Sequence, residues 1–157
     1  NHFRGPLCER RRLRYREGGL DLHRKVAVQD GHGLNPLPIY CSATGRVLFA
    51  DMSDSKLTDF FGKAPPSRRT PRTKTAVGEI IGEIRRAAAS GYAISDEEIE
   101  LGLRALAVPV KRDGKTIAAL SVSTSSGRVP VREIRERFLP VLETCARRIA
   151  QEATNIG

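Results

Sequence analysis

With 157 residues the chain has the length of one domain, and its 39% hydrophobic content can form a core that must be aliphatic, because tryptophan is absent and aromatic residues make up 5%. No apolar run approaches the roughly 18 residues of a membrane span, and the basic start is no signal peptide, so a cytoplasmic protein without a membrane partner is expected. The net charge of +9 is uneven: residues 1–25 and 63–74 each carry +5, whereas the remainder carries −1, which argues against a general nucleic-acid-binding surface.

The cysteines and histidines provide no arrangement typical of a metal or redox site. Cys8, Cys41 and Cys145 are widely spaced and form no CxxC pair. All three histidines lie within the first 32 residues. No metal and no other cofactor is therefore expected.

The first third of the chain contains few clear elements. Residues 1–23 form a basic N-terminal segment that the pattern does not define, and residues 23–29 alternate weakly as a strand does. A loop rich in glycine and proline follows. Small and apolar residues at helical spacing then predict a helix over residues 42–50, and residues 53–61 predict a short helix capped by Ser53 or Asp54.

Stronger patterns follow from residue 75 onward. Apolar residues recurring every three or four positions predict a helix that ends at Ser90-Gly91. A brief strand then leads into Ser95-Asp96-Glu97-Glu98, which matches the S-x-x-E capping box and predicts a helix start. Two apolar runs, residues 103–110 and 116–123, flank Asp113-Gly114 and predict a hairpin.

The last predicted element is a helix beginning at Pro130, which Pro140 should kink or interrupt. Strands, helices, a hairpin and a closing helix together indicate an α+β fold, with an antiparallel sheet flanked by helices.

One face of the predicted hairpin is a candidate small-molecule site. Alternation places Ser121 and Ser123 on the same face, together with small and apolar residues of the preceding strand. Apolar walls with a few hydroxyls are typical of ligand pockets. The alternative is that both serines face solvent.

Ser42 offers a second candidate, because the N–H groups at a helix start favour an anion. The plainer alternative is a capped helix with small residues for close packing. Catalysis is not indicated: the chain has no GxSxG, HExxH or P-loop motif, and the capping box accounts for the carboxylates at 96–98. We therefore expect no enzyme.

Three segments resemble the C-terminal effector-binding domain of IclR-family transcription regulators: LPIYCSATGRVLFA (37–50), GYAISDEEIELGLRALAVPV (91–110) and AALSVSTSS (118–126). The resemblance covers about residues 24–152. GRVLFA and STSSGRVPVREIRERFLPVL look most similar to regulators of protocatechuate and 4-hydroxybenzoate catabolism. The family resemblance implies a GAF-like domain over residues 24–157, with a curved antiparallel sheet.

The resemblance also implies a function and partners. A small, possibly aromatic carboxylate would be the effector, the chain would form a homodimer or tetramer, and DNA would be bound only through a winged helix-turn-helix outside this chain. The implied ligand-binding residues are Ala43, Thr44, Ser95, Leu103, Ala105, Ser121, Ser123, Val26 and Gln29. Ser95 stands where some members have Asp, and residues 63–74 match no family motif.

Two other functions remain open. One is a GAF-like dimerisation module without an open ligand pocket. The other is direct nucleic-acid binding through the arginine-rich arm at residues 10–16.

Overall fold

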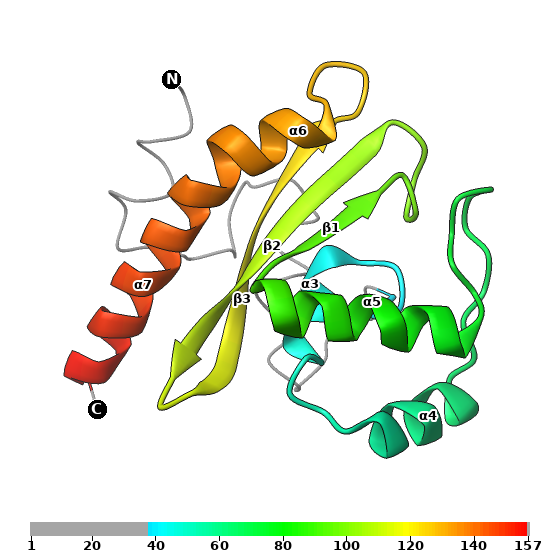
Figure 1. Ribbon diagram of the computed structural model, residues 1–157, viewed down its shortest axis with the longest axis horizontal. Helices are drawn as coiled ribbons and strands as arrows, with labels where there is room; N and C mark the ends of the chain where they lie inside the picture. Colours follow the sequence, from blue (N-terminus) through cyan, green and yellow to red (C-terminus); the bar gives the residue numbers. More distant parts are fainter. Residues whose placement is uncertain (1–37, 157) are drawn as a thin grey trace.

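The computed structural model describes the backbone of residues 38–156 and the side chains of residues 38–152. The predicted strand at residues 23–29, with the candidate ligand residues Val26 and Gln29, lies outside this range, as does the arginine-rich arm. Figure 1 shows the described part as an antiparallel sheet with helices packed on both faces, which confirms the α+β class.

Within the described residues the sheet has the strand order β1-β2-β3, all antiparallel, with β1 at Ala93–Asp96, β2 at Leu103–Arg112 and β3 at Lys115–Ser125. The β2–β3 hairpin turns at Asp113 (φ 51°) and Gly114 (φ 77°). Positive φ at both central residues is the geometry of a tight hairpin turn that Asp-Gly favours. The predicted hairpin is confirmed.

In residues 38–92, three helices precede β1. They are α3 (Ala43–Leu48), α4 (Asp54–Lys63) and α5 (Val77–Ser90), and all three were expected from the sequence. Ser53 caps α4 by accepting a hydrogen bond from Lys56 N–H. Gly91 ends α5 in the left-handed conformation at φ 81°, where a Cβ would be strained.

The final helix is continuous but not regular. It comprises α6 (Val131–Glu133), a π-helical stretch η1 (Ile134–Phe138) and α7 (Leu139–Ile156). Pro140 has no N–H to offer to the turn before it. The π-helical turn directly before it is the predicted interruption of the α-helix.

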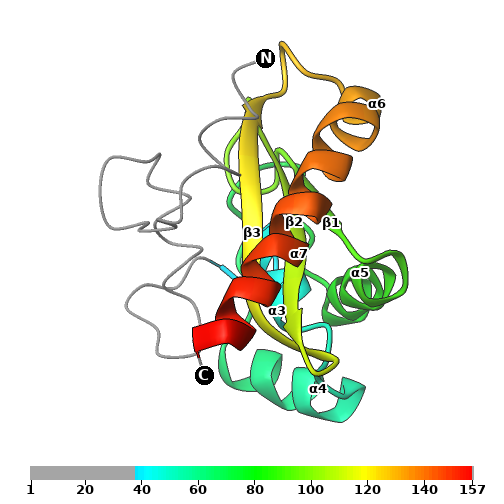
Figure 2. The same ribbon diagram turned by 90° about the vertical axis from the view of Figure 1, so that its left-hand side faces the viewer.

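The two faces of the sheet carry different cores. Large aliphatic residues of β2 and β3 pack under α7, which lies in front of the sheet in Figure 2; the cluster includes Leu106, Val108, Leu120, Val122 and Leu142. The opposite face is lined with alanine and lies under α3 and α5; its cluster is Ala43, Val47, Ala87, Ala93, Ala105, Ala107 and Ala119. Small side chains allow α3 to approach this face closely.

The prediction that a helix starts at Ser95 is wrong. Ser95 belongs to β1, Glu97 has a left-handed backbone (φ 56°), and the chain reaches β2 through turns rather than a helix. Glu98 does not reach back to a cap, because its carboxylate is engaged by Arg46 on α3. A tertiary ion pair has overridden a local capping signal.

Gly45 in α3 allows a close approach of two backbones, which makes a substitution there informative. A Cβ at residue 45 would lie 2.5 Å from Ile39 Cα, whereas a Cβ at Gly82 of α5 meets nothing within 4 Å. We expect Gly45→Ala to lower the free energy of unfolding by about 1–3 kcal/mol. The control Gly82→Ala should raise it by about 0.5–1 kcal/mol, since alanine is the better helix former. Urea denaturation measures both, and equal shifts would contradict the close approach.

Candidate functional site

The alanine-lined face of the sheet carries two buried hydroxyls. In the β2–β3 register Ala105 lies opposite Ser123 and Ala107 opposite Ser121, so all four share one face, as alternation predicted. Ser121 is 2% exposed. Neither Ser121 Oγ nor Ser123 Oγ has a hydrogen-bond partner in the part of the chain that the structure describes. Leaving a buried hydroxyl unsatisfied costs about 1–3 kcal/mol, which a ligand or a water would relieve.

Helix α3 lies over this same face. Ala43 and Val47 of α3 pack in one cluster with the alanines of β2 and β3. Thr44, the next residue of α3 after Ala43, is also buried. The structure therefore brings the predicted site residues Ala43, Ala105, Ser121 and Ser123 to one side of the sheet. Leu103, at the first position of β2, pairs with Ser125 at the end of the same face.

Ser42 caps α3 as predicted. Its Oγ accepts a hydrogen bond from Gly45 N–H at 3.0 Å. This cap accounts for the serine without any ligand. An anion at this helix start remains a prediction.

Ser95 points to the same face of the sheet, yet its hydroxyl is already used. Its Oγ donates to the carbonyl oxygen of Cys41 at 2.7 Å, which joins β1 to the turn before α3. A hydroxyl has one proton to donate, so Ser95 can offer a ligand only an acceptor lone pair. Its contact with a ligand remains a prediction.

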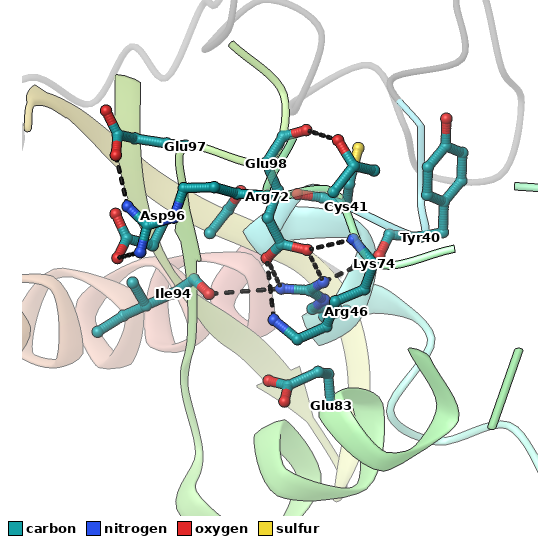
Figure 3. A network of polar contacts seen from close by, with 12 residues as sticks. Tyr40, Cys41, Arg46, Arg72, Lys74, Glu83, Ile94, Asp96, Glu97 and Glu98 are labelled. Carbon is teal, nitrogen blue, oxygen red and sulfur yellow. Dashed lines mark hydrogen bonds and ion pairs between the residues drawn. The ribbon is translucent and has the colours of Figure 1, made fainter. Parts of the chain in front are cut away.

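A buried ion pair lies next to the hydroxyl face and joins α3 to the segment after β1. Arg46 and Glu98 are 1% and 3% exposed. Their contact is bidentate, with Nη1–Oε2 at 2.7 Å and Nη2–Oε1 at 2.8 Å (Figure 3). The guanidinium also donates to the carbonyl oxygens of Tyr40 at 3.0 Å and Ile94 at 3.4 Å. Paired hydrogen bonds of this kind are what make a buried charge tolerable.

The basic loop at residues 63–74 docks onto the same segment. Thr73 Oγ1 donates to the Glu98 carbonyl oxygen at 2.7 Å, and Lys74 N–H donates to Glu98 Oε1 at 3.3 Å. Thr70 Oγ1 donates to the Glu97 carbonyl oxygen at 2.7 Å. The loop, which no sequence motif explained, thus supports the buried pair with its backbone, hydroxyls and charge.

Three further contacts neutralise the remaining carboxylates. Arg72 pairs with Asp96 and Glu97, and Arg104 pairs with Asp96 at 2.8 Å. Glu97 Oε1 also accepts from Gly102 N–H at 2.9 Å. The carboxylates of 96–98 are therefore fixed by cationic partners, and their arrangement indicates a structural role.

Three other features of the described residues bear on the sequence-based expectations: the buried cysteine, possible metal ligands and helix length. Burial raises the pKa of the Cys41 thiol from 9.0 to about 12, so the thiolate nucleophile is suppressed. Within residues 38–152 no cluster of three or more histidine, cysteine or acidic side chains could hold a metal ion. None of the described helices is both long and apolar enough to cross a bilayer.

Comparison with known proteins identifies the class and then the family. Residues 26–151 match the family model described as the bacterial transcriptional regulator IclR C-terminal domain. The chain belongs to the IclR family, and the match is to the C-terminal domain of its members.

Two curated relatives are regulatory proteins by name. The chain is 39% identical over 117 residues to the Pca regulon regulatory protein of Pseudomonas putida, covering 74% of this chain and 40% of the relative. It is 31% identical over 160 residues to the p-hydroxybenzoate hydroxylase transcriptional activator of Acinetobacter baylyi, covering 92% and 59%. The chain thus spans about half the length of these relatives. Both are transcription regulators, in agreement with the expectation that this chain is no enzyme.

Two solved structures of transcription-regulator domains have a fold similar to that of this chain. A double mutant of the PobR inducer-binding domain from Acinetobacter, in complex with 3-hydroxybenzoic acid, superposes with a TM-score of 0.71 at 32% identity, covering 74% of this chain and 67% of that one. The C-terminal domain of Escherichia coli KdgR gives a TM-score of 0.66 at 33% identity, covering 73% and 70%.

Sequence reasoning missed the Arg46–Glu98 pair. One signal was available: Arg46 is the only charged residue in the helix Ala43–Leu48, and an arginine within a short buried helix needs an acidic partner. The sequence does not determine which carboxylate among Asp96, Glu97, Glu98 and Glu100 is that partner.

The surface carboxylate Glu97 makes stability depend on pH. Hydrogen bonds from Gly102 N–H and Ser126, then Arg72, lower the pKa of Glu97 from its ordinary 4.5. Folding therefore favours the ionised form: the stabilisation is full above pH 4.5 and is lost as pH falls through the lower folded pKa. We expect Glu97→Gln to flatten this acid limb in urea unfolding measured between pH 3 and 7. An unchanged slope would contradict the role of Glu97.

Proposed function

We propose that this domain senses a small aromatic carboxylate, bound between the hydroxyl face of β2–β3 and the first turn of α3. The observation that carries the proposal is the pair of buried Ser121 and Ser123 hydroxyls, which have no hydrogen-bond partner among the described residues and lie on the face of the sheet that α3 packs against. A ligand with hydroxyl and carboxylate groups would satisfy both of them.

The composition of the face supports an aromatic ligand. Ala105, Ala107 and Ala119 provide apolar walls with little bulk, and Thr44 adds a third hydroxyl-bearing side chain nearby. A benzene ring with polar substituents matches such a lining. The names of the relatives point to the same class, because one activates p-hydroxybenzoate hydroxylase transcription and a PobR domain has been solved with 3-hydroxybenzoic acid.

The response would be transmitted through assembly. In this proposal the chain forms a homodimer or tetramer in the cytoplasm, and the effector favours one arrangement of subunits. That arrangement would set the spacing of winged helix-turn-helix domains outside this chain, which alone contact DNA. Because Arg72 and Lys74 are committed to carboxylates, the basic loop gives little support to direct DNA binding.

Calorimetric titration with 4-hydroxybenzoate, protocatechuate and a β-keto acid tests the ligand class. We expect heat with the aromatic acids. Ser121→Ala and Ser123→Ala should each weaken binding by roughly 2- to 10-fold, the value of one hydrogen bond, while leaving the free domain as stable or more so.

The matched control is Thr124→Ala, because Thr124 directly follows Ser123 on β3 and faces the other side of the sheet, where its hydroxyl donates to the Arg104 carbonyl oxygen. The affinity of Thr124→Ala for the aromatic acids should equal that of the wild type. Absence of heat with every acid would refute the aromatic effector and favour a dimerisation module without an open pocket.

A further inference from the structure

We propose that Glu98 is a positioning residue for the effector site, acting through Arg46 to fix the first turn of α3 over the hydroxyl face. This inference rests on the proposed function and assigns a role to an acidic residue that does not lie on the ligand face.

The turn before α3 is held at two consecutive carbonyls. Arg46 Nη2 donates to the Tyr40 carbonyl oxygen at 3.0 Å, and Ser95 Oγ donates to that of Cys41 at 2.7 Å. Within the turn, Cys41 and Ser42 N–H both donate to the Pro38 carbonyl oxygen. The turn is therefore anchored to β1 by Ser95 and to α3 by Arg46.

The turn and the first turn of α3 form one unit. A Cβ on Gly45 would lie within 3 Å of Ile39, so the helix start is pressed against the turn that precedes it. Ala43 and Thr44, which are predicted to contact the ligand, lie inside this unit. A displacement of Arg46 moves them together with the turn.

Glu98 holds Arg46 in place. Both carboxylate oxygens accept from the guanidinium, and in the described residues no other acidic side chain pairs with Arg46. Glu98 is itself held by Thr73 and Lys74 of the basic loop, and Figure 3 shows Lys74 beside its carboxylate. Arg46 Nε has no hydrogen-bond partner among the described residues, so that without Glu98 the contacts left to the guanidinium within them are the neutral carbonyl oxygens of Tyr40 and Ile94.

Removing the Glu98 charge should therefore disturb ligand binding as well as stability. An uncompensated buried arginine moves toward water or another acceptor, and α3 follows it. The affinity for the effector falls because the site must then be ordered at the moment of binding. A residue that only stabilised the fold would change the melting temperature and leave the affinity of the folded protein unchanged.

The experiment compares Glu98→Gln with Glu97→Gln, which removes the same charge one residue away from the Arg46 contact. Calorimetry with 4-hydroxybenzoate is run where circular dichroism shows each variant folded. We expect Glu98→Gln to weaken binding about tenfold or more and Glu97→Gln to stay within about twofold. Hydrogen exchange of residues 39–48 should rise in Glu98→Gln alone.

A second variant covers the case in which Glu98→Gln does not fold. Combining Arg46→Met with Glu98→Met replaces the pair by apolar groups and leaves no charge unpaired, a change that proteins often tolerate. The same loss of affinity is expected, because methionine cannot donate to the Tyr40 carbonyl oxygen. If this double variant also fails to fold, the pair is a requirement of the fold and the positioning role is overturned.

The outcomes separate the two proposals. Wild-type binding with unchanged affinity in a folded Glu98→Gln or in the double variant overturns the positioning role and leaves the effector site standing. Absence of binding by the wild type overturns the effector site and this inference with it.

Discussion

The buried Arg46–Glu98 pair is the interaction on which the arrangement of this domain depends. Its two partners are 52 residues apart in sequence and come from α3 and from the segment after β1. A buried ion pair gains little over an apolar contact, but a broken one is costly, because the remaining charge has no partner. The pair therefore constrains more than it stabilises: α3, β1 and the basic loop must take their places together.

The Arg46–Glu98 pair matters for the proposed site because the two faces of the sheet differ. One face carries leucine and valine and packs against α7, whereas the face that packs against α3 carries alanine and two serines whose hydroxyl oxygens are buried. The small residues of the second face bring α3 close while providing little volume of their own. Because the ion pair lies beside this second face and not on it, the charges fix the helix without offering a competing partner to a ligand.

The carboxylates at 96–98 illustrate how one sequence signal supports two structures. Ser95 and Glu98 have the spacing of a capping box, yet Ser95 donates to the Cys41 carbonyl oxygen and Glu98 binds Arg46. The pattern was compatible with both arrangements. The strand wins because burying Arg46 without Glu98 would cost more than a missing cap, which is worth about 1 kcal/mol. The ion pairs of these carboxylates with Arg46, Arg72 and Arg104 indicate a structural role.

The amino-acid sequence by itself determined the local elements: the capped helix at Ser53, the stop at Gly91, the Asp113-Gly114 hairpin, the interruption near Pro140 and the face shared by Ser121 and Ser123. Each depends on periodicity or on backbone preferences within a few residues. Only the tertiary structure decided which carboxylate pairs with Arg46, that the basic loop docks on that carboxylate, and that α3 packs against the alanine-lined face on which the two serines lie. These contacts join residues far apart in the chain, and no short-range pattern encodes which of several like charges will be buried together.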